Sequence, residues 1–130
     1  SGWERLGQLL LRLGQYDKAE ELYHTLLEQA ANESEQGYYY HQVGYVKSHQ
    51  GDGLAALAFH QRALHIHERI LPSDDPKLAT SYNNIAMVYK QMKQPAEALA
   101  FYEKAVEIQQ KALLPDHVDL AATYNNLGGP

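Results

Sequence analysis

Residues 78–119 decide the fold, and they read LATSYNNIAMVYKQMKQPAEALAFYEKAVEIQQKALLPDHVD. The opening of this stretch, Leu78-Ala79-x-x-Tyr82-Asn83-Asn84-Ile85-Ala86, returns as Leu120-Ala121-x-x-Tyr124-Asn125-Asn126-Leu127-Gly128, an offset of 42 residues. A fixed period of this size is the sequence signature of stacked repeats, in which each unit is one small supersecondary structure. The rest of the chain can therefore be aligned to this unit.

The same frame extends back through the chain and predicts pairs of amphipathic helices. A small residue marks each first helix, an aromatic precedes it by four positions, and an alanine follows it by twelve. The small residues are Gly7, Gly44, Ala86 and Gly128; the aromatics are Trp3, Tyr40, Tyr82 and Tyr124; the alanines are Ala19, Ala56 and Ala98, followed four residues later by Tyr23, His60 and Tyr102. Apolar residues at helical spacing predict helices over residues 3–13, 16–31, 36–50 and 54–71, with a third pair broken near Gln94-Pro95.

Turn and capping residues separate these helices. Gly14 and the run Gly51-Asp52-Gly53 are typical of helix ends and turns. The polar segment at residues 32–34 should cap the third helix, and Asp74 or Asp75 should cap the fifth, with Pro76 in its first turn. No run alternates with period two, so the sequence predicts no strand.

The frame resembles the tetratricopeptide repeat, W-x2-L-G-x2-Y followed by A-x3-F. It stands here as Trp3-x2-Leu6-Gly7 with Ala19-x3-Tyr23, and as Tyr82-x2-Ile85-Ala86-x2-Tyr89 with Ala98-x3-Tyr102. Lys47, Lys93 and His60 depart from the pattern at single positions. The resemblance implies an all-α, right-handed superhelical solenoid of three hairpins plus one terminal helix. We expect one domain over residues 1–130, with repeats near 1–33, 34–75 and 76–117 and a partial one at 118–130, as a piece of a longer protein.

The 42-residue period resembles the repeats of kinesin light chain. The residues that carry this likeness are Leu71-Pro72-Ser73-Asp74-Asp75-Pro76-x-Leu78-Ala79, Asp116-His117-x-Asp119-Leu120-Ala121, and the pairs Asn83-Asn84 and Asn125-Asn126. The resemblance implies a protein-binding scaffold with a cargo or adaptor role. Such repeats also occur beside other domains, so the alternative is a regulatory or oligomerising region of a larger enzyme, for example an ADP-ribosyltransferase. In that case the last helix, through Leu120, Tyr124 and Leu127, would pack on another chain or on further repeats of the same protein.

The composition of the chain argues against several kinds of function. The net charge is −5 and the basic residues are scattered, which argues against nucleic acid as a partner. No apolar run is long enough to span a bilayer, and the absence of cysteine fits the cytoplasm. No convergent catalytic set or metal motif occurs: His65 and His67, two residues apart, point away from each other on a helix. We therefore predict a non-enzyme without metal or cofactor.

The candidate site is the concave groove that the first helix of each repeat lines. A protein or peptide segment is the expected ligand, because amide, hydroxyl, imidazole and aromatic groups suit an extended backbone. The recurring asparagines could instead be structural. Tyr40, Tyr82 and Tyr124 are expected to be wedges between hairpins, and His41 and His49 to titrate near neutral pH. The predicted groove residues are Arg5, Arg12, Tyr38, His41, Gln42, Tyr45, His49, Thr80, Asn83, Asn84, Met87, Lys90, Gln91, Asn125 and Asn126.

Overall fold

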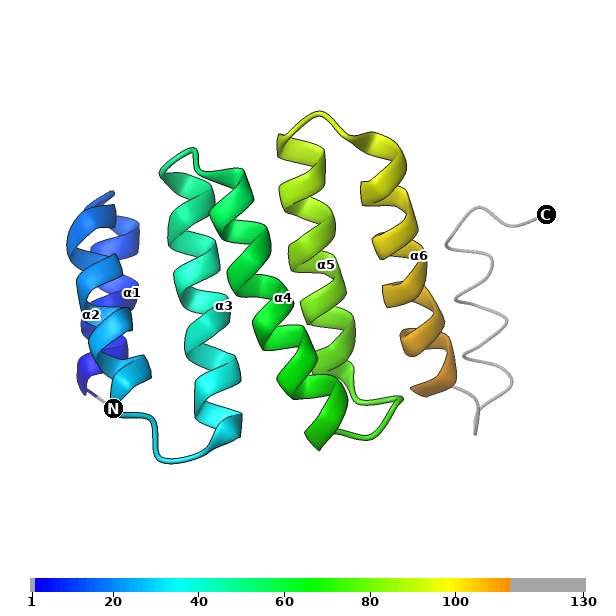
Figure 1. The fold of residues 1–130 in the computed structure, drawn as a ribbon, viewed down its shortest axis with the longest axis horizontal. Coiled ribbons are helices and arrows are strands. Elements are labelled where there is room, and N and C mark those ends of the chain that lie inside the picture. The colour runs from blue at the N-terminus through cyan, green and yellow to red at the C-terminus, as the bar shows by residue number, and fades with distance from the viewer. Residues whose placement is uncertain (1, 113–130) are drawn as a thin grey trace.

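Six helices follow one another as three antiparallel hairpins in a computed structural model that describes residues 2–112 (Figure 1). The helices are α1 (Gly2–Arg12), α2 (Tyr16–Glu28), α3 (Glu33–His49), α4 (Gly53–Ile70), α5 (Pro76–Gln91) and α6 (Pro95–Ala112). Each hairpin lies beside the one before it, as the blue-to-orange order in Figure 1 shows. The chain is thus an all-α repeat solenoid, as predicted. The expected terminal helix, with Tyr124, lies outside the described residues.

The helices begin where the capping residues predict. Asn32 accepts a hydrogen bond from the backbone N–H of Glu35 at 2.9 Å, which satisfies one of the free donors at the start of α3. Asp75 caps α5 in the same way, and Pro76 occupies the first turn. The prediction of Asp74 or Asp75 therefore resolves to Asp75.

The three hairpin turns use one left-handed residue each, at equivalent positions. Gly14 has φ 73°, Gly51 has φ 84°, and Lys93 has φ 62°. Glycine adopts this region without cost, whereas a residue with a Cβ is strained there by about 1–2 kcal/mol. The third turn therefore keeps the backbone conformation of the first two, although Lys93 stands there in place of glycine.

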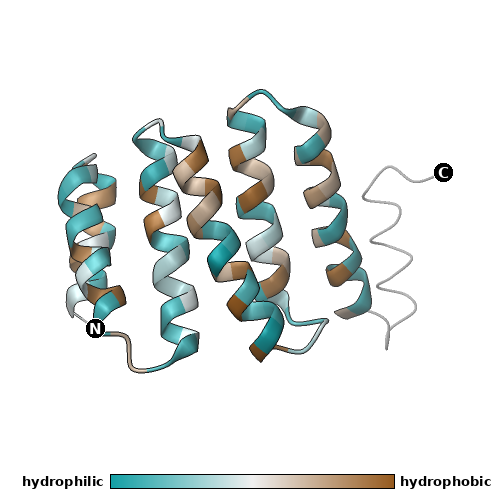
Figure 2. Cartoon of the chain, in the orientation of Figure 1, coloured by the Kyte–Doolittle hydropathy of each residue, from teal (hydrophilic) through white to brown (hydrophobic). Residues whose placement is uncertain are grey.

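The core lies between successive helices rather than in one central cluster. Between the first and second hairpins it contains Ala19, Tyr23, Tyr39, Val43 and Val46. A second cluster, between α4 and α5, contains Ala56, Leu57, Ile85 and Val88. Figure 2 shows brown residues among teal ones along α4, α5 and α6, as expected when each of these helices buries one stripe. A hairpin of this kind is stable only because its neighbours cover it.

The packing of the tyrosines predicted to be wedges between hairpins confirms Tyr82 and corrects Tyr40. Tyr82 does join two hairpins: its ring packs on Phe101 at 6.1 Å, and its hydroxyl donates to Glu68 of α4 at 2.8 Å. Tyr40 instead stacks on Phe59 inside its own hairpin and is half-buried. Its neighbour Tyr39 is the ring buried between the first two hairpins, because it is on the side of α3 that faces Tyr23 of α2, at 6.5 Å.

Candidate functional site

A cavity of about 390 Å³ lies where the first helices of the three hairpins meet. It draws residues from α1, α3 and α5, the helices predicted to line the concave face. The lining residues are Gln8, Leu11, Arg12, His41, Gln42, Tyr45 and Asn84. Five of them, Arg12, His41, Gln42, Tyr45 and Asn84, belong to the predicted groove. Arg12 and Asn84 are 72 residues apart in the sequence, and both line this one cavity, as counting from the repeat frame predicts.

The other predicted groove residues lie outside this cavity. Those with the largest exposed apolar surface are Met87, 49% exposed, and Tyr38, 39% exposed. Thr80 donates to the backbone carbonyl of Pro76 in its own helix at 3.3 Å, and Gln91 accepts a hydrogen bond from Ser48 across the α3–α5 gap. The remaining ones are Arg5, His49 and Lys90, all exposed, and Asn83, which is half-buried; Asn125 and Asn126 fall outside the described residues.

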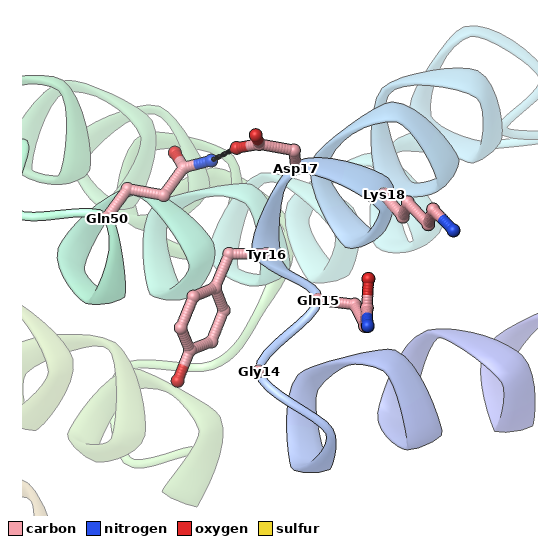
Figure 3. Close-up of a pocket in the computed structure, with 6 residues that line it drawn as sticks. All are labelled: Gly14, Gln15, Tyr16, Asp17, Lys18 and Gln50. Carbon is pink, nitrogen blue, oxygen red and sulfur yellow. Dashed lines mark hydrogen bonds between the residues drawn. The ribbon is translucent and has the colours of Figure 1, made fainter.

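Stacked rings continue the cavity wall toward the hairpin turns. Tyr45 contacts His49 with ring centroids 4.3 Å apart, and His49 stacks on Tyr16 at 5.2 Å. Tyr16 begins α2 and was not among the predicted residues. It also lines a cavity of about 530 Å³ at the first turn, where Gln50 donates to Asp17 at 2.9 Å (Figure 3). A continuous aromatic surface therefore runs from the groove to this turn.

Lys47 stands where the repeat signature has an aromatic ring, and its packing explains the exchange. Its ammonium lies 3.0 Å from the carboxylate of Glu20 on α2. The hydrogen bond from Lys47 lowers the pKa of Glu20, against the opposing effect of its partial burial. An ion pair thus links α2 and α3 where an aromatic contact is expected, and the frame is preserved.

Three histidines and a serine form a polar cluster inside the stack, which we call the histidine–serine cluster: His41 of α3, His60 and His67 of α4, and Ser81 of α5. The Nδ1 atoms of His41 and His60 are 2.8 Å apart, and the Nε2 atom of His41 lies 2.7 Å from the Ser81 hydroxyl. Nδ1 of His67 lies 3.2 Å from the same hydroxyl. The cluster therefore connects three helices.

Donors and acceptors in the cluster can be assigned from the Ser81 hydroxyl. We assign its hydrogen to the backbone carbonyl of Lys77, 3.2 Å away, which leaves its oxygen to accept from both His41 and His67. His41 then carries its hydrogen on Nε2, and its Nδ1 must accept from His60. All three imidazoles are neutral in this arrangement.

Burial is the main cause of the altered titration of the cluster. It lowers the pKa of His41 to about 3, with a further contribution from the neighbouring His60 and His67, and that of His60 to about 4. The pKa of His67 is also lowered, by burial and then by Lys77, while Asp75 acts in the opposite direction. The expectation that His41 titrates near neutral pH is therefore wrong, because the sequence frame does not reveal its contact with α4.

The cluster corrects the proposed role of His41 and does not form a catalytic or metal site. Both ring nitrogens of His41 are used inside the protein, so it presents its ring to the cavity and no free polar atom. Ser81 is 0% exposed, so its hydroxyl cannot reach a substrate despite its contact with an imidazole. Within residues 2–112, no three histidine or acidic side chains converge as metal ligands.

Glycine spacing is the sequence signal that could have found the cluster. A Cβ on Gly44 would lie 2.8 Å from the His60 ring, and one on Gly37 would lie 2.6 Å from Nε2 of His67. The glycines are seven residues apart on α3, and the histidines are seven apart on α4. Seven residues is two helical turns, so both pairs share one face, and two imidazoles pack into two glycine gaps.

Comparison with known proteins now gives the family. The sequence matches the tetratricopeptide repeat at residues 1–32, 35–111 and 77–129. The chain belongs to the tetratricopeptide repeat family. No curated protein matches it over its sequence.

Solved structures share the fold of this tetratricopeptide array. BtubC (BKLC) from P. vanneervenii superposes with a TM-score of 0.76 at 28% identity, over 97% of this chain and 52% of that one. Repeats of a putative kinesin light chain of Podosopora anserina give 0.74 at 21% identity, over 97% and 62%. The TPR domain of Arabidopsis FLU gives 0.72 at 21% identity, over 85% and 93%. The array resembles kinesin light chain repeats, and it spans between half and two thirds of the first two structures.

The family and the fold support a general role as a protein-interaction scaffold. Among residues 2–112, no helix combines the length and apolar character that crossing a membrane requires.

Proposed function

We propose that this tetratricopeptide array is a non-catalytic scaffold that holds a segment of a partner protein in the cavity between α1, α3 and α5. The observation that carries the proposal is the convergence of Arg12, Gln42, Tyr45 and Asn84, from three separate repeats, on one hollow. A site assembled from several repeats suits a ligand that extends along the stack. A cargo or adaptor role like that of kinesin light chain fits this site.

The chemistry of the cavity favours a peptide. Gln42 and Asn84 each carry an amide that donates and accepts, as a peptide backbone requires. Tyr45 is 45% exposed and offers an aromatic face, and the guanidinium of Arg12 can pair with a carboxylate. The ligand therefore needs backbone amides, one apolar side chain and a nearby acidic group.

A panel of synthetic peptides of acidic, neutral and basic composition tests the proposal by fluorescence anisotropy. We expect saturable binding of an acidic member, which Asn84→Ala and Tyr45→Ala each weaken about tenfold, since each removes about 1–2 kcal/mol of contact. Gln61→Ala and Leu99→Ala, at exposed positions on α4 and α6, are the matched controls and should leave affinity unchanged. Equal binding by all four variants would contradict a site at this cavity.

A second candidate function is assembly with another helical unit, which one observation favours. α1 and the residue that follows it expose three large apolar side chains, Trp3 at 61%, Leu9 at 48% and Leu13 at 64%. Apolar side chains grouped in this way are typical of contact surfaces. A concentration-dependent change in mass by light scattering, removed by Trp3→Glu, would favour this function, whereas a monomer at all concentrations would argue against it.

A further inference from the structure

The second and third hairpins each hold a cation over a pair of aromatic rings at their surface. The guanidinium of Arg62 lies 5.8 Å from the centroid of the Tyr40 ring and 5.7 Å from that of Phe59. In the third hairpin the ammonium of Lys104 lies over the equivalent tyrosine at 5.6 Å and the equivalent phenylalanine at 5.1 Å. The surroundings of the two cations can therefore be compared position by position.

Arg62 has unused hydrogen-bond donors. The attraction between a guanidinium and a ring uses none of its five N–H groups as donors. Within residues 2–112, Arg62 makes no hydrogen bond and no ion pair, whereas the other arginine of α4, Arg69, donates to Glu33 at 2.7 Å. The two rings hold the guanidinium in place, so it loses less side-chain freedom when it binds an anion.

A cavity of about 520 Å³ adjoins this guanidinium. Its lining residues come from α3 and α4, and they are Tyr40, Ala58, Gln61, Arg62, His65 and Ile66. Half of these side chains offer apolar surface and half offer polar groups, and none of the lining residues is acidic. Ligand sites of this size combine apolar walls with a few polar groups. A free guanidinium beside an apolar wall suits an anionic group on an apolar body.

The matching faces of the two neighbouring second helices are acidic. Counted from the small residue of each repeat, the exposed positions Ala58, Gln61, Arg62 and His65 of α4 have equivalents on α2 and α6. On α2 they are Glu21, His24, Thr25 and Glu28, and on α6 they are Ala100, Glu103, Lys104 and Glu107. Glu107 also lines a cavity together with Lys104. Of the two cations over rings, only Arg62 thus stands on a face without a carboxylate.

We propose that this face of α4 is a second binding site, separate from the groove, in which Arg62 pairs with one carboxylate side chain of a partner-protein segment. The segment has an apolar side chain beside the acid, which covers the Tyr40 ring, and basic residues on either side, which face the glutamates of α2 and α6. The cavity beside Arg62 shares no lining residue with the groove cavity. The array can therefore bind a segment at each site.

The charge of the site favours a carboxylate over a phosphate. One guanidinium matches one carboxylate, with which it forms a pair of parallel hydrogen bonds. A phosphate monoester carries nearly two negative charges at neutral pH, and the glutamates of α2 and α6 repel the second. His65 follows Arg62 by three positions and so lies on the same side of α4, where it can donate one ring N–H to the same carboxylate.

Nuclear magnetic resonance with a synthetic peptide locates the site. The probe has one glutamate beside a leucine, with lysines on both sides, and the reference peptide has glutamine in place of the glutamate. We expect saturable shifts of the backbone amide signals of α4 around Arg62, with the reference peptide binding about fivefold more weakly. Inorganic phosphate is the second probe and should bind more weakly than the glutamate peptide.

Variants of exposed residues show whether Arg62 and its uncharged neighbours make the site. Arg62→Gln should weaken binding of the glutamate peptide about fivefold. Gln61→Glu combined with His65→Glu keeps Arg62 but copies the acids of the third repeat, and it should weaken binding by a similar factor. Two controls should bind like the parent chain: Arg69→Gln, an arginine of the same helix that is already paired, and Asn84→Ala in the groove.

Several results would overturn the second site. Shifts centred on Gln42 and Asn84 would assign the peptide to the groove instead. The proposal also fails if no saturable shift occurs, if the two peptides bind equally, if phosphate binds more tightly, or if Arg62→Gln binds like the parent chain. Loss of binding in Arg69→Gln as large as in Arg62→Gln would show a general effect of positive charge on α4.

Discussion

The two junctions between hairpins use the same positions of the repeat frame with different chemistry. Beside the first junction, Tyr23 packs under Gly7 within the first hairpin, and Tyr39 of the second hairpin donates to Glu4 of the first at 3.1 Å. Beside the second junction, His60 packs under Gly44 within the second hairpin, and His41 contacts Ser81 of the third hairpin at 2.7 Å. Three pairs of residues stand at equivalent positions, counted from the small residue that marks the first helix of each repeat. They are Tyr23 and His60, Glu4 and His41, and Tyr39 and Ser81. One geometry therefore tolerates either tyrosine or histidine.

The two junctions differ in the side chains that can gain or lose a proton, which are phenols at the first and imidazoles at the second. Burial raises the pKa of Tyr23 to about 12, and burial with the bond to Glu4 raises the pKa of Tyr39. Both phenols thus remain neutral in any physiological medium. The imidazoles of the second junction are neutral only because burial holds their pKa values below the ordinary one. The frame fixes where a ring packs, and the kind of ring decides how the junction responds to acid.

Acidification should give the largest contrast between the junctions. Lowering the pH from about 7.5 to about 5.5 should reduce the free energy of unfolding by about 3 kcal/mol, since unfolded His41 and His60 each take up a proton that the folded chain excludes. The loss occurs as pH falls through about 6.5 toward the lower folded pKa values. Urea titrations followed by circular dichroism measure it. A chain equally stable at both values would mean that the histidines are not buried as described.

Filling the glycine gap within the first hairpin and the one within the second should cost a similar amount of stability. In Gly7→Ala the new Cβ would lie 2.5 Å from the Tyr23 hydroxyl oxygen, and in Gly44→Ala it would lie 2.8 Å from the His60 ring. Displacing either ring should lower the unfolding free energy by about 2 kcal/mol, after allowing for the better helix propensity of alanine. Gly2→Ala, which meets nothing within 4 Å, is the control for propensity. Thermal unfolding of the three variants separates these contributions.

Removing a phenolic hydroxyl at the first junction should have opposite effects at its two tyrosines. The Tyr23 hydroxyl is buried without a hydrogen-bond partner in the described part of the chain, so Tyr23→Phe should stabilise the fold by about 1 kcal/mol. Tyr39→Phe loses the bond to Glu4 and should destabilise it by about 1 kcal/mol. Chemical denaturation compares the two directly. Destabilisation by Tyr23→Phe would imply a partner for its hydroxyl.

Local patterns explain why the fold was predictable. The caps at Asn32 and Asp75 and the turn glycines act within a few residues, so their effect is visible in the sequence. The 42-residue period gave the stacking order, and the frame also found five of the residues around the concave cavity, because side-chain direction repeats with the helix. That these residues bind a peptide stays a prediction.

Contacts across several helices explain what was missed. The histidine–serine cluster draws on α3, α4 and α5, and nothing local to His41 distinguishes it from a histidine in an open groove. Tyr39 and Tyr16 also have no local signal. The burial of Tyr39 depends on Tyr23 in the preceding helix, and Tyr16 meets His49 only where the first and second hairpins pack together. Equal spacing of Gly37 with Gly44 and of His60 with His67 was the one available signal.

Within residues 2–112, the sequence by itself determined the six helices, their caps and turns, and the order in which the hairpins stack, because these depend on near neighbours and on a repeated period. The tertiary structure decided which polar groups became buried partners. Lys47 met Glu20, and His41 met Ser81, only once separate hairpins packed together, and His41 met His60 only once α3 packed on α4. The physical reason is that the charge state of a side chain depends on its total surroundings, and those are complete only in the assembled stack.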